Sequence, residues 1–87
     1  MIEVYFSRQS QKFLDKSDKV LASRLFEASN NLGKEPFPHN CLRVENQFYE
    51  GERVFRIRVG DYRILYTVSN EKKRIIIVSI DKRENAY

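Results

Sequence analysis

VFRIRVGDYRILY, from Val54 to Tyr66, reads as two β-strands joined by a tight turn at Gly60-Asp61. A two-residue loop with glycine in its first position suits a type II′ turn, because the twist of that turn matches the twist of the flanking strands. The turn sets a register that pairs Val59 with Tyr62, Arg58 with Arg63, and Ile57 with Ile64. The segment therefore predicts a β-hairpin whose two faces differ in chemistry.

One face of this hairpin is apolar and the other is basic. The apolar side carries Phe55, Ile57, Val59, Tyr62, Ile64 and Tyr66, and the reverse carries Arg56, Arg58 and Arg63. Like charges opposed across two strands destabilise a sheet by roughly 0.2–1 kcal/mol per pair. The pairing of Arg58 with Arg63 therefore indicates that this face binds an anion, with phosphate as the first candidate. The alternative is an ordinary solvated sheet face, with the arginines neutralised by Glu45, Glu50 or Glu52.

Two helices are predicted upstream of the hairpin. Ile2 to Phe6 alternates as a short strand, and Ser7 can cap a helix from Arg8 to about Lys16. Ser17 or Asp18 can cap a second helix that runs to about Leu32. Its apolar stripe is predicted to hold Val20, Leu21, Leu25, Phe26, Ala28 and Leu32. Gly33 suits the left-handed residue that follows a helix.

Two further strands flank the hairpin. Cys41 to about Gln47 is one candidate strand. Arg74 to Ile80 is a nearly continuous β-branched run, which is typical of a strand that is buried on both faces inside a sheet.

This order of elements predicts an α+β fold in two layers, formed by residues 1–87 as a single domain. The N-terminal strand and a two-helix hairpin are expected on one face of a mainly antiparallel sheet of four to five strands. The helices should cover the side of Phe55, Ile57, Tyr62 and Ile64. The arginine side would then remain as a shallow, concave, basic surface.

The positive charge is concentrated in the second half of the chain. Seven basic and seven acidic residues cancel up to Gly51, whereas nine basic against five acidic residues from Glu52 onward account for the whole net charge of +4. This asymmetry favours an anionic partner, RNA or DNA above all, over a merely solvated basic surface.

Several classes of protein are excluded by composition. No apolar run approaches the roughly 20 residues that span a bilayer, and charged residues from Glu3 to Asp15 leave no core for a signal peptide. The single cysteine, Cys41, has no partner for an internal disulfide and fits the reducing cytoplasm. With His39 as the only histidine, no structural zinc site is expected, and no cofactor is predicted.

The segments RIRVGDYRILY, IIIVSI and DKRENAY, in this order of elements, resemble the RelE-type toxins of type II toxin–antitoxin systems. The broader group includes the ParE-type toxins, and the resemblance covers essentially the whole chain. It implies a ribosome-dependent endoribonuclease that cuts mRNA in the ribosomal A site. The implied reaction is attack of a ribose 2′-hydroxyl on the adjacent phosphate, which leaves a 2′,3′-cyclic phosphate. The implied partners are a RelB-like antitoxin, the ribosome and mRNA.

The resemblance also assigns a catalytic set. It comprises Arg56, Arg58, Arg63, Arg83 and Tyr87. Fixed guanidinium groups suit the negative charge that builds on the phosphoryl oxygens, a task we assign to Arg63 and Arg83. Candidates for the general acid and base remain open among Tyr87, Arg56, Arg58, Lys82 and Asp81. Because arginine and tyrosine are poor bases near neutral pH, catalysis should rest mainly on orientation and charge stabilisation. Tyr87 is alternatively expected to stack on a base.

Further basic residues are predicted to contact RNA or the ribosome. They are Lys72, Lys73, Arg74 and Lys82. An acidic, partly disordered antitoxin is expected to cover the patch of Arg56, Arg58, Arg63 and Arg83. Two other functions compete with mRNA cleavage: a ParE-like toxin that binds DNA gyrase, and a non-catalytic nucleic-acid-binding module. The paired strand arginines, together with Arg83 and Tyr87, favour the ribonuclease.

Overall fold

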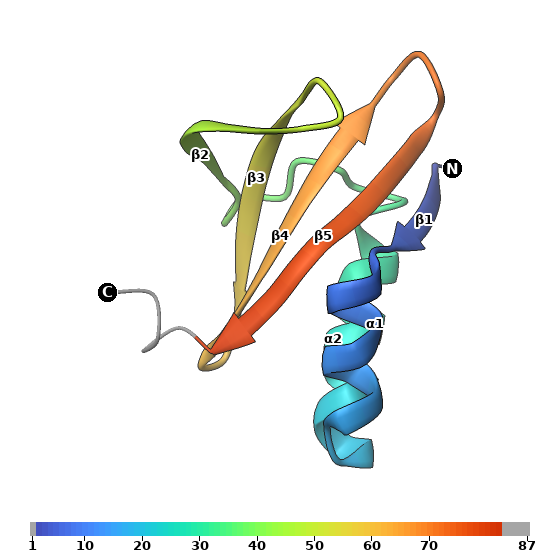
Figure 1. Cartoon of the computed structure of the whole chain (residues 1–87), viewed down its shortest axis with the longest axis vertical. Helices are drawn as coiled ribbons and strands as arrows, with labels where there is room; N and C mark the ends of the chain where they lie inside the picture. The colour runs from blue at the N-terminus through green and yellow to red at the C-terminus, as the bar shows by residue number, and fades with distance from the viewer. Residues whose placement is uncertain (1, 83–87) are drawn as a thin grey trace.

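Two helices lie against one face of a five-stranded sheet in the computed structural model, which describes residues 2–82 (Figure 1). The elements are β1 (Glu3–Phe6), α1 (Arg8–Lys16), α2 (Lys19–Asn31), β2 (Leu42–Tyr49), β3 (Glu52–Val59), β4 (Tyr62–Ser69) and β5 (Arg74–Lys82). The strand order is β1-β5-β4-β3-β2, with β1 parallel to β5 and the other pairs antiparallel. The predicted two-layer α+β fold is confirmed.

The β3–β4 hairpin has the predicted register. Val59 pairs with Tyr62, Arg58 with Arg63, and Ile57 with Ile64. Gly60 has a φ of 60°, whereas Asp61 lies outside the positive-φ region, which is the combination that a type II′ turn requires. The apolar side of this hairpin faces the helices, and Ile64 is fully buried there.

Both helices begin at side-chain caps that the sequence predicts. The Ser7 hydroxyl accepts a hydrogen bond from the backbone N–H of Ser10 at 3.1 Å, and the Asp18 carboxylate accepts one from Leu21 at 2.9 Å. Each bond satisfies one of the backbone donors that a helix N-terminus leaves unpaired. Asp18, rather than Ser17, is therefore the cap of α2.

The buried stripe of α2 is narrower than predicted. Leu25 and Leu32 are buried, and Leu21, Ala22 and Ala28 pack against the same core. Val20 is 72% exposed and Phe26 is 49% exposed, so the prediction was wrong for these two residues. Val20 precedes the partly buried Leu21, and Phe26 follows the buried Leu25. Because one residue turns the helix by about 100°, both side chains point away from the core. The Phe26 ring instead stacks on Phe6, with ring centroids 5.6 Å apart.

Gly33 follows α2 for a different reason than predicted. Its φ is not in the left-handed region, so the prediction of a left-handed cap was wrong. A Cβ atom at Gly33 would lie 2.5 Å from the backbone oxygen of Ile2. The Ile2 N–H donates to the Gly33 carbonyl at 2.9 Å, so the missing side chain lets the start of the chain pass close to the end of α2.

Strand β5 lies inside the sheet, as predicted, but it is fully buried on one face only. Ile75, Ile77 and Ile80 have no exposed surface, whereas Ile76 and Val78 are half-buried. The pairing with β4 shifts at this point, because Leu65 lies opposite Ser79 and Tyr66 opposite Ile77. Val78 is the extra residue of a β-bulge, which moves Ile80 onto the helix face although it is three positions after Ile77.

Strand β2 is longer and less regular than the predicted segment from Cys41 to Gln47. It pairs with β3 at Leu42 and Arg43, and again at Phe48 and Tyr49, with a shift of register between the two pairs. Asn46 has a φ of 60° inside this shift. In residues 2–82, no helix is both long enough and apolar enough to cross a bilayer.

Tyr66 is a structural residue of the core. It is fully buried, and its hydroxyl donates a hydrogen bond to the Pro36 carbonyl at 2.7 Å. This contact ties the loop after α2 to the middle of the sheet. Burial, followed by the neighbouring Cys41, raises the pKa of the Tyr66 phenol above its ordinary value.

Replacing Tyr66 by phenylalanine should lower the free energy of unfolding by about 1 kcal/mol at neutral pH, the usual net value of one hydrogen bond. Because the folded protein raises this pKa, the neutral phenol stabilises the fold below the unfolded value of about 10 and that contribution is lost as the pH rises further. Urea unfolding from pH 7 to pH 11 should therefore show the gap between wild type and Tyr66→Phe closing above about pH 10. A gap that stays constant over this range would contradict the assignment.

Candidate active site

Three strand arginines line one groove on the face of the sheet opposite the helices. Arg56, Arg58 and Arg63 share this groove, which has a volume of about 470 Å³. Its other lining residues are Asn40, Leu42, Ile57 and Gly60. The hairpin register brings Arg58 and Arg63 directly opposite each other, so the groove collects positive charge at the Gly60-Asp61 end of the sheet.

The groove combines cationic donors with an apolar wall. Arg58 is exposed, Arg56 is half-buried, and the Arg63 side chain is 19% exposed. Leu42 lies opposite Arg56 across the β2–β3 pair and is 56% exposed. Guanidinium groups bind phosphate oxygens in two-pronged geometry, and an exposed apolar side chain can contact a base or a sugar. The combination suits a nucleotide chain.

Asp81 supplies the counter-charge of Arg63. The Arg63 Nη2 atom lies 3.5 Å from Asp81 Oδ1, and the two residues are paired across β4 and β5. The sequence suggested Glu45, Glu50 or Glu52 for such a role, but Glu50 instead pairs with Arg74 at 3.3 Å. Within residues 2–82, Arg63 Nε is buried and has no hydrogen-bond partner. The ion pair with Asp81 therefore leaves one buried donor of this guanidinium unsatisfied.

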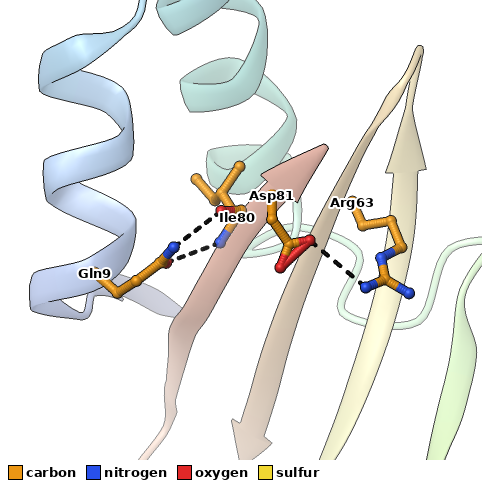
Figure 2. A network of polar contacts seen from close by, with 4 residues as sticks. All are labelled: Gln9, Arg63, Ile80 and Asp81. Carbon is orange, nitrogen blue, oxygen red and sulfur yellow. Dashed lines mark hydrogen bonds and ion pairs between the residues drawn. The ribbon is translucent and has the colours of Figure 1, made fainter. Parts of the chain in front are cut away.

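A glutamine of α1 holds the strand that carries Asp81. The Gln9 Nε2 atom donates to the Ile80 carbonyl, and Gln9 Oε1 accepts from the Ile80 N–H, both at 3.1 Å. Figure 2 shows these two bonds beside the Arg63–Asp81 pair. The side-chain amide thus takes the place that a neighbouring strand would fill at this edge of β5.

The predicted RNA contacts do not join the groove. Lys72 and Lys73 are exposed in the β4–β5 turn, and Arg74 begins β5. This turn lies at the opposite end of β4 from Arg63, roughly 20 Å away at about 3.3 Å per residue. Lys82 ends β5 opposite Tyr62. Two other predicted residues, Arg83 and Tyr87, lie outside the residues that the structure describes.

The sequence missed Gln9, Asn40 and Leu42 as neighbours of the site. Leu42 enters the groove through its pairing with Arg56, and the irregular register of β2 gives no periodic signal for this pairing. Asp81 was foreseen as an acid or base candidate but not as the partner of Arg63. No group of three or more His, Cys, Asp or Glu side chains within residues 2–82 is arranged to hold a metal ion.

Comparison with known proteins gives a family and a set of related folds. The family model for the ParE toxin of type II toxin–antitoxin systems matches residues 4–87. A chain of the archaeal RelE–RelB complex from Pyrococcus horikoshii OT3 is 27% identical, with a TM-score of 0.80 and coverage of 98% of both chains. No curated protein matches the sequence.

Two further solved structures share the fold. A chain of the RelBE2 toxin–antitoxin complex from Mycobacterium tuberculosis is 24% identical, with a TM-score of 0.75 and coverage of 94% of this chain and 98% of that one. The isolated RelE toxin of E. coli is 17% identical, with a TM-score of 0.72 and coverage of 94% and 84%.

Proposed function

Because the chain belongs to the ParE toxin family of type II toxin–antitoxin systems, within the RelE/ParE superfamily, we propose that it is a toxin that cuts mRNA on the ribosome. The observation that carries this proposal is the gathering of Arg56, Arg58 and Arg63 in one open groove. The similarity to a chain of an archaeal RelE–RelB complex supports it. The active unit is a single domain formed by residues 1–87, acting in the cytoplasm, where ribosomes translate.

The proposed reaction is attack of a ribose 2′-hydroxyl on the adjacent phosphate, with departure of the 5′ oxygen. Negative charge builds on the phosphoryl oxygens, and Arg63, together with Arg83, stabilises it. Arg63 suits this task, because it lines the groove and phosphate oxygens accept hydrogen bonds from a guanidinium group. Arg56 and Arg58 hold the mRNA backbone in the groove.

Proton transfer is the smaller part of this mechanism. Tyr87 is proposed either to move a proton or to stack on the base beside the cut. Binding of the message in the ribosomal A site supplies orientation, which can account for a large share of a rate enhancement. Lys72, Lys73 and Arg74 are proposed to contact ribosomal RNA at a distance from the cut, and Lys82 to contact RNA beside the catalytic arginines.

We propose a RelB-like antitoxin as the partner that silences this groove. The related chains come from RelE–RelB and RelBE2 complexes. An acidic segment that covers Arg56, Arg58, Arg63 and Arg83 would neutralise the charge that mRNA must meet. An antitoxin complex that leaves this groove open to the ribosome would contradict the proposal.

The deciding experiment is cleavage of a defined mRNA on programmed ribosomes, with the ends mapped by primer extension and naked mRNA as the control. Cuts in the A site that require ribosomes are expected, and they should disappear in the Arg63→Ala/Arg83→Ala variant. A folded, toxic protein that cuts neither substrate would overturn the proposal.

A second candidate function is inhibition of DNA gyrase, because the family model that matches the chain is that of the ParE toxin. This function requires binding to gyrase without RNA cleavage. A supercoiling assay with purified gyrase separates the two candidates. Inhibition of supercoiling, with mRNA left intact on ribosomes, would favour gyrase as the target.

A further inference from the structure

The edge of β5 beyond Ile77 is satisfied by side chains instead of a strand. β1 pairs with β5 only from Glu3–Arg74 to Phe6–Ile77, and the chain then turns into α1. The hydroxyls of Ser10 and Ser7 donate to the carbonyls of Ile77, at 3.0 Å, and Val78, at 2.6 Å. Gln9 completes the series with its two bonds to Ile80. The first turn of α1 therefore fixes where the last part of β5 lies.

The bulge at Val78 decides which face Asp81 occupies. Side chains alternate along a strand, so Ile75, Ile77 and Asp81 would share the buried face in an uninterrupted strand. The extra residue reverses the alternation, which leaves Ile80 in the core and puts Asp81 opposite Arg63. The location of an acidic group beside the groove is thus built into the register of the sheet.

The pair formed by Arg63 and Asp81 is only partly solvated. Asp81 Oδ1 and Arg63 Nε are both buried and have no hydrogen-bond partner in residues 2–82, although the Asp81 side chain as a whole is 41% exposed. Arg63 lies between this carboxylate and the like charge of Arg58. Asp81 draws the guanidinium toward β5, and Arg58 repels it in the same direction.

We propose that Asp81 is a positioning residue for Arg63, and that Gln9 keeps Asp81 in place through the backbone of Ile80. Neither residue touches the phosphate. Asp81 lowers the positive charge of the groove and so weakens ground-state binding of RNA, but it holds the guanidinium where the phosphoryl charge develops. The inference deepens the proposed function, because it concerns the same arginine.

Cleavage kinetics on programmed ribosomes should distinguish the contribution of Asp81 from that of Gln9. Asp81→Asn removes the charge at constant size, so the single-turnover rate should fall while the half-saturating toxin concentration falls or stays constant. Gln9→Met removes both hydrogen bonds and no charge, so the rate should fall with no tightening of binding. The cleavage rate of each variant should fall by roughly 10- to 100-fold. Losses of this size follow in other proteins when a residue that supports a functional group is removed, or when a reacting group is displaced by about 1 Å.

Matched controls exist on the same elements. Asp61→Asn removes a negative charge from the neighbouring turn without contacting Arg63, so it should leave the single-turnover rate unchanged. Gln11 lies on α1 and bonds the exposed Asp15 at 3.0 Å, so Gln11→Met changes the same type of residue away from β5. If Asp81→Asn and Asp61→Asn affected the rate equally, the positioning role would be wrong.

A second measurement needs no catalysis. The Nε–H signal of Arg63, assigned by its loss in Arg63→Lys, should exchange slowly with water in the wild type, because Nε is buried. The protection should be lost in Asp81→Asn and Gln9→Met and kept in both controls. Unchanged protection in Asp81→Asn would overturn the inference. If the wild type cut no mRNA while this pattern held, the proposed function would fail and the positioning of Arg63 would stand.

Discussion

Replacing Arg63 by alanine is expected to lower the rate of mRNA cleavage on programmed ribosomes by roughly 100- to 1000-fold, the loss seen when one donor to a developing oxyanion is removed. The Arg63 side chain lines the groove and is 19% exposed, and its Nε has no hydrogen-bond partner in residues 2–82. A donor with these properties is already desolvated before substrate arrives. Its interaction with phosphoryl charge is therefore stronger than that of an exposed cation.

The fold should survive this substitution. The ion pair with Asp81 is partly exposed, and such pairs contribute at most about 1 kcal/mol, while removal of Arg63 also relieves its repulsion of Arg58. Arg63→Lys should fall between wild type and alanine, because lysine keeps the charge but loses the planar fork. Thermal unfolding of each variant should accompany the rates measured by single turnover.

Arg53→Ala is the matched control for this prediction. Arg53 lies on β3, like Arg58, but the alternation of the strand places it on the other face, and it is exposed. The Arg53→Ala variant should therefore cut mRNA at the wild-type rate. An Arg63→Ala protein that retained more than about one-tenth of the wild-type rate would be inconsistent with the role of a transition-state donor.

Replacing Leu25 by alanine is expected to cost about 2–5 kcal/mol in the free energy of unfolding, the range for truncation of a fully buried leucine. Leu25 has no exposed surface and belongs to the hydrophobic core between the two helices and the sheet. The whole stability of a domain of this size is about 5–15 kcal/mol. The substitution should therefore remove a large fraction of it and leave part of the protein unfolded near 37 °C.

Val20→Ala tests whether burial, and not helix composition, causes this loss. Val20 lies on the same helix but is 72% exposed, so its truncation should change the free energy of unfolding by no more than about 0.5 kcal/mol. Urea denaturation of both variants, followed by circular dichroism, measures the difference. Equal losses at the two positions would show that the core boundary along α2 is misplaced.

Local signals made the hairpin and the helix caps predictable. The Gly60-Asp61 turn admits few backbone conformations, so it determines the register that opposes Arg58 and Arg63. The caps at Ser7 and Asp18 depend on side chains within three residues of the bonds they make. Each of these features is decided by a few neighbouring residues, and a single sequence displays them.

Features set by distant segments were not predictable in the same way. Gly33 is required by the approach of Ile2, which no local pattern announces. The run from Arg74 to Ile80 is nearly continuously β-branched, so its composition does not reveal the bulge at Val78. The arginines of the groove could therefore be named from the sequence, whereas Asp81 as the partner of Arg63 could not.

The parallel pairing of β1 with β5 bears on when the pair formed by Arg63 and Asp81 can assemble during synthesis of the chain. The bonds between Gln9 and Ile80 join residues 71 positions apart, and β5 separates β1 from the rest of the sheet. Contacts of such long sequence separation form late and slow the folding of small domains. A nascent chain that has emerged only through β4 lacks both β5, the strand between β1 and β4, and Asp81. The pairing of Arg63 with Asp81 at the edge of this groove is therefore made only after β5 has emerged and joined β4.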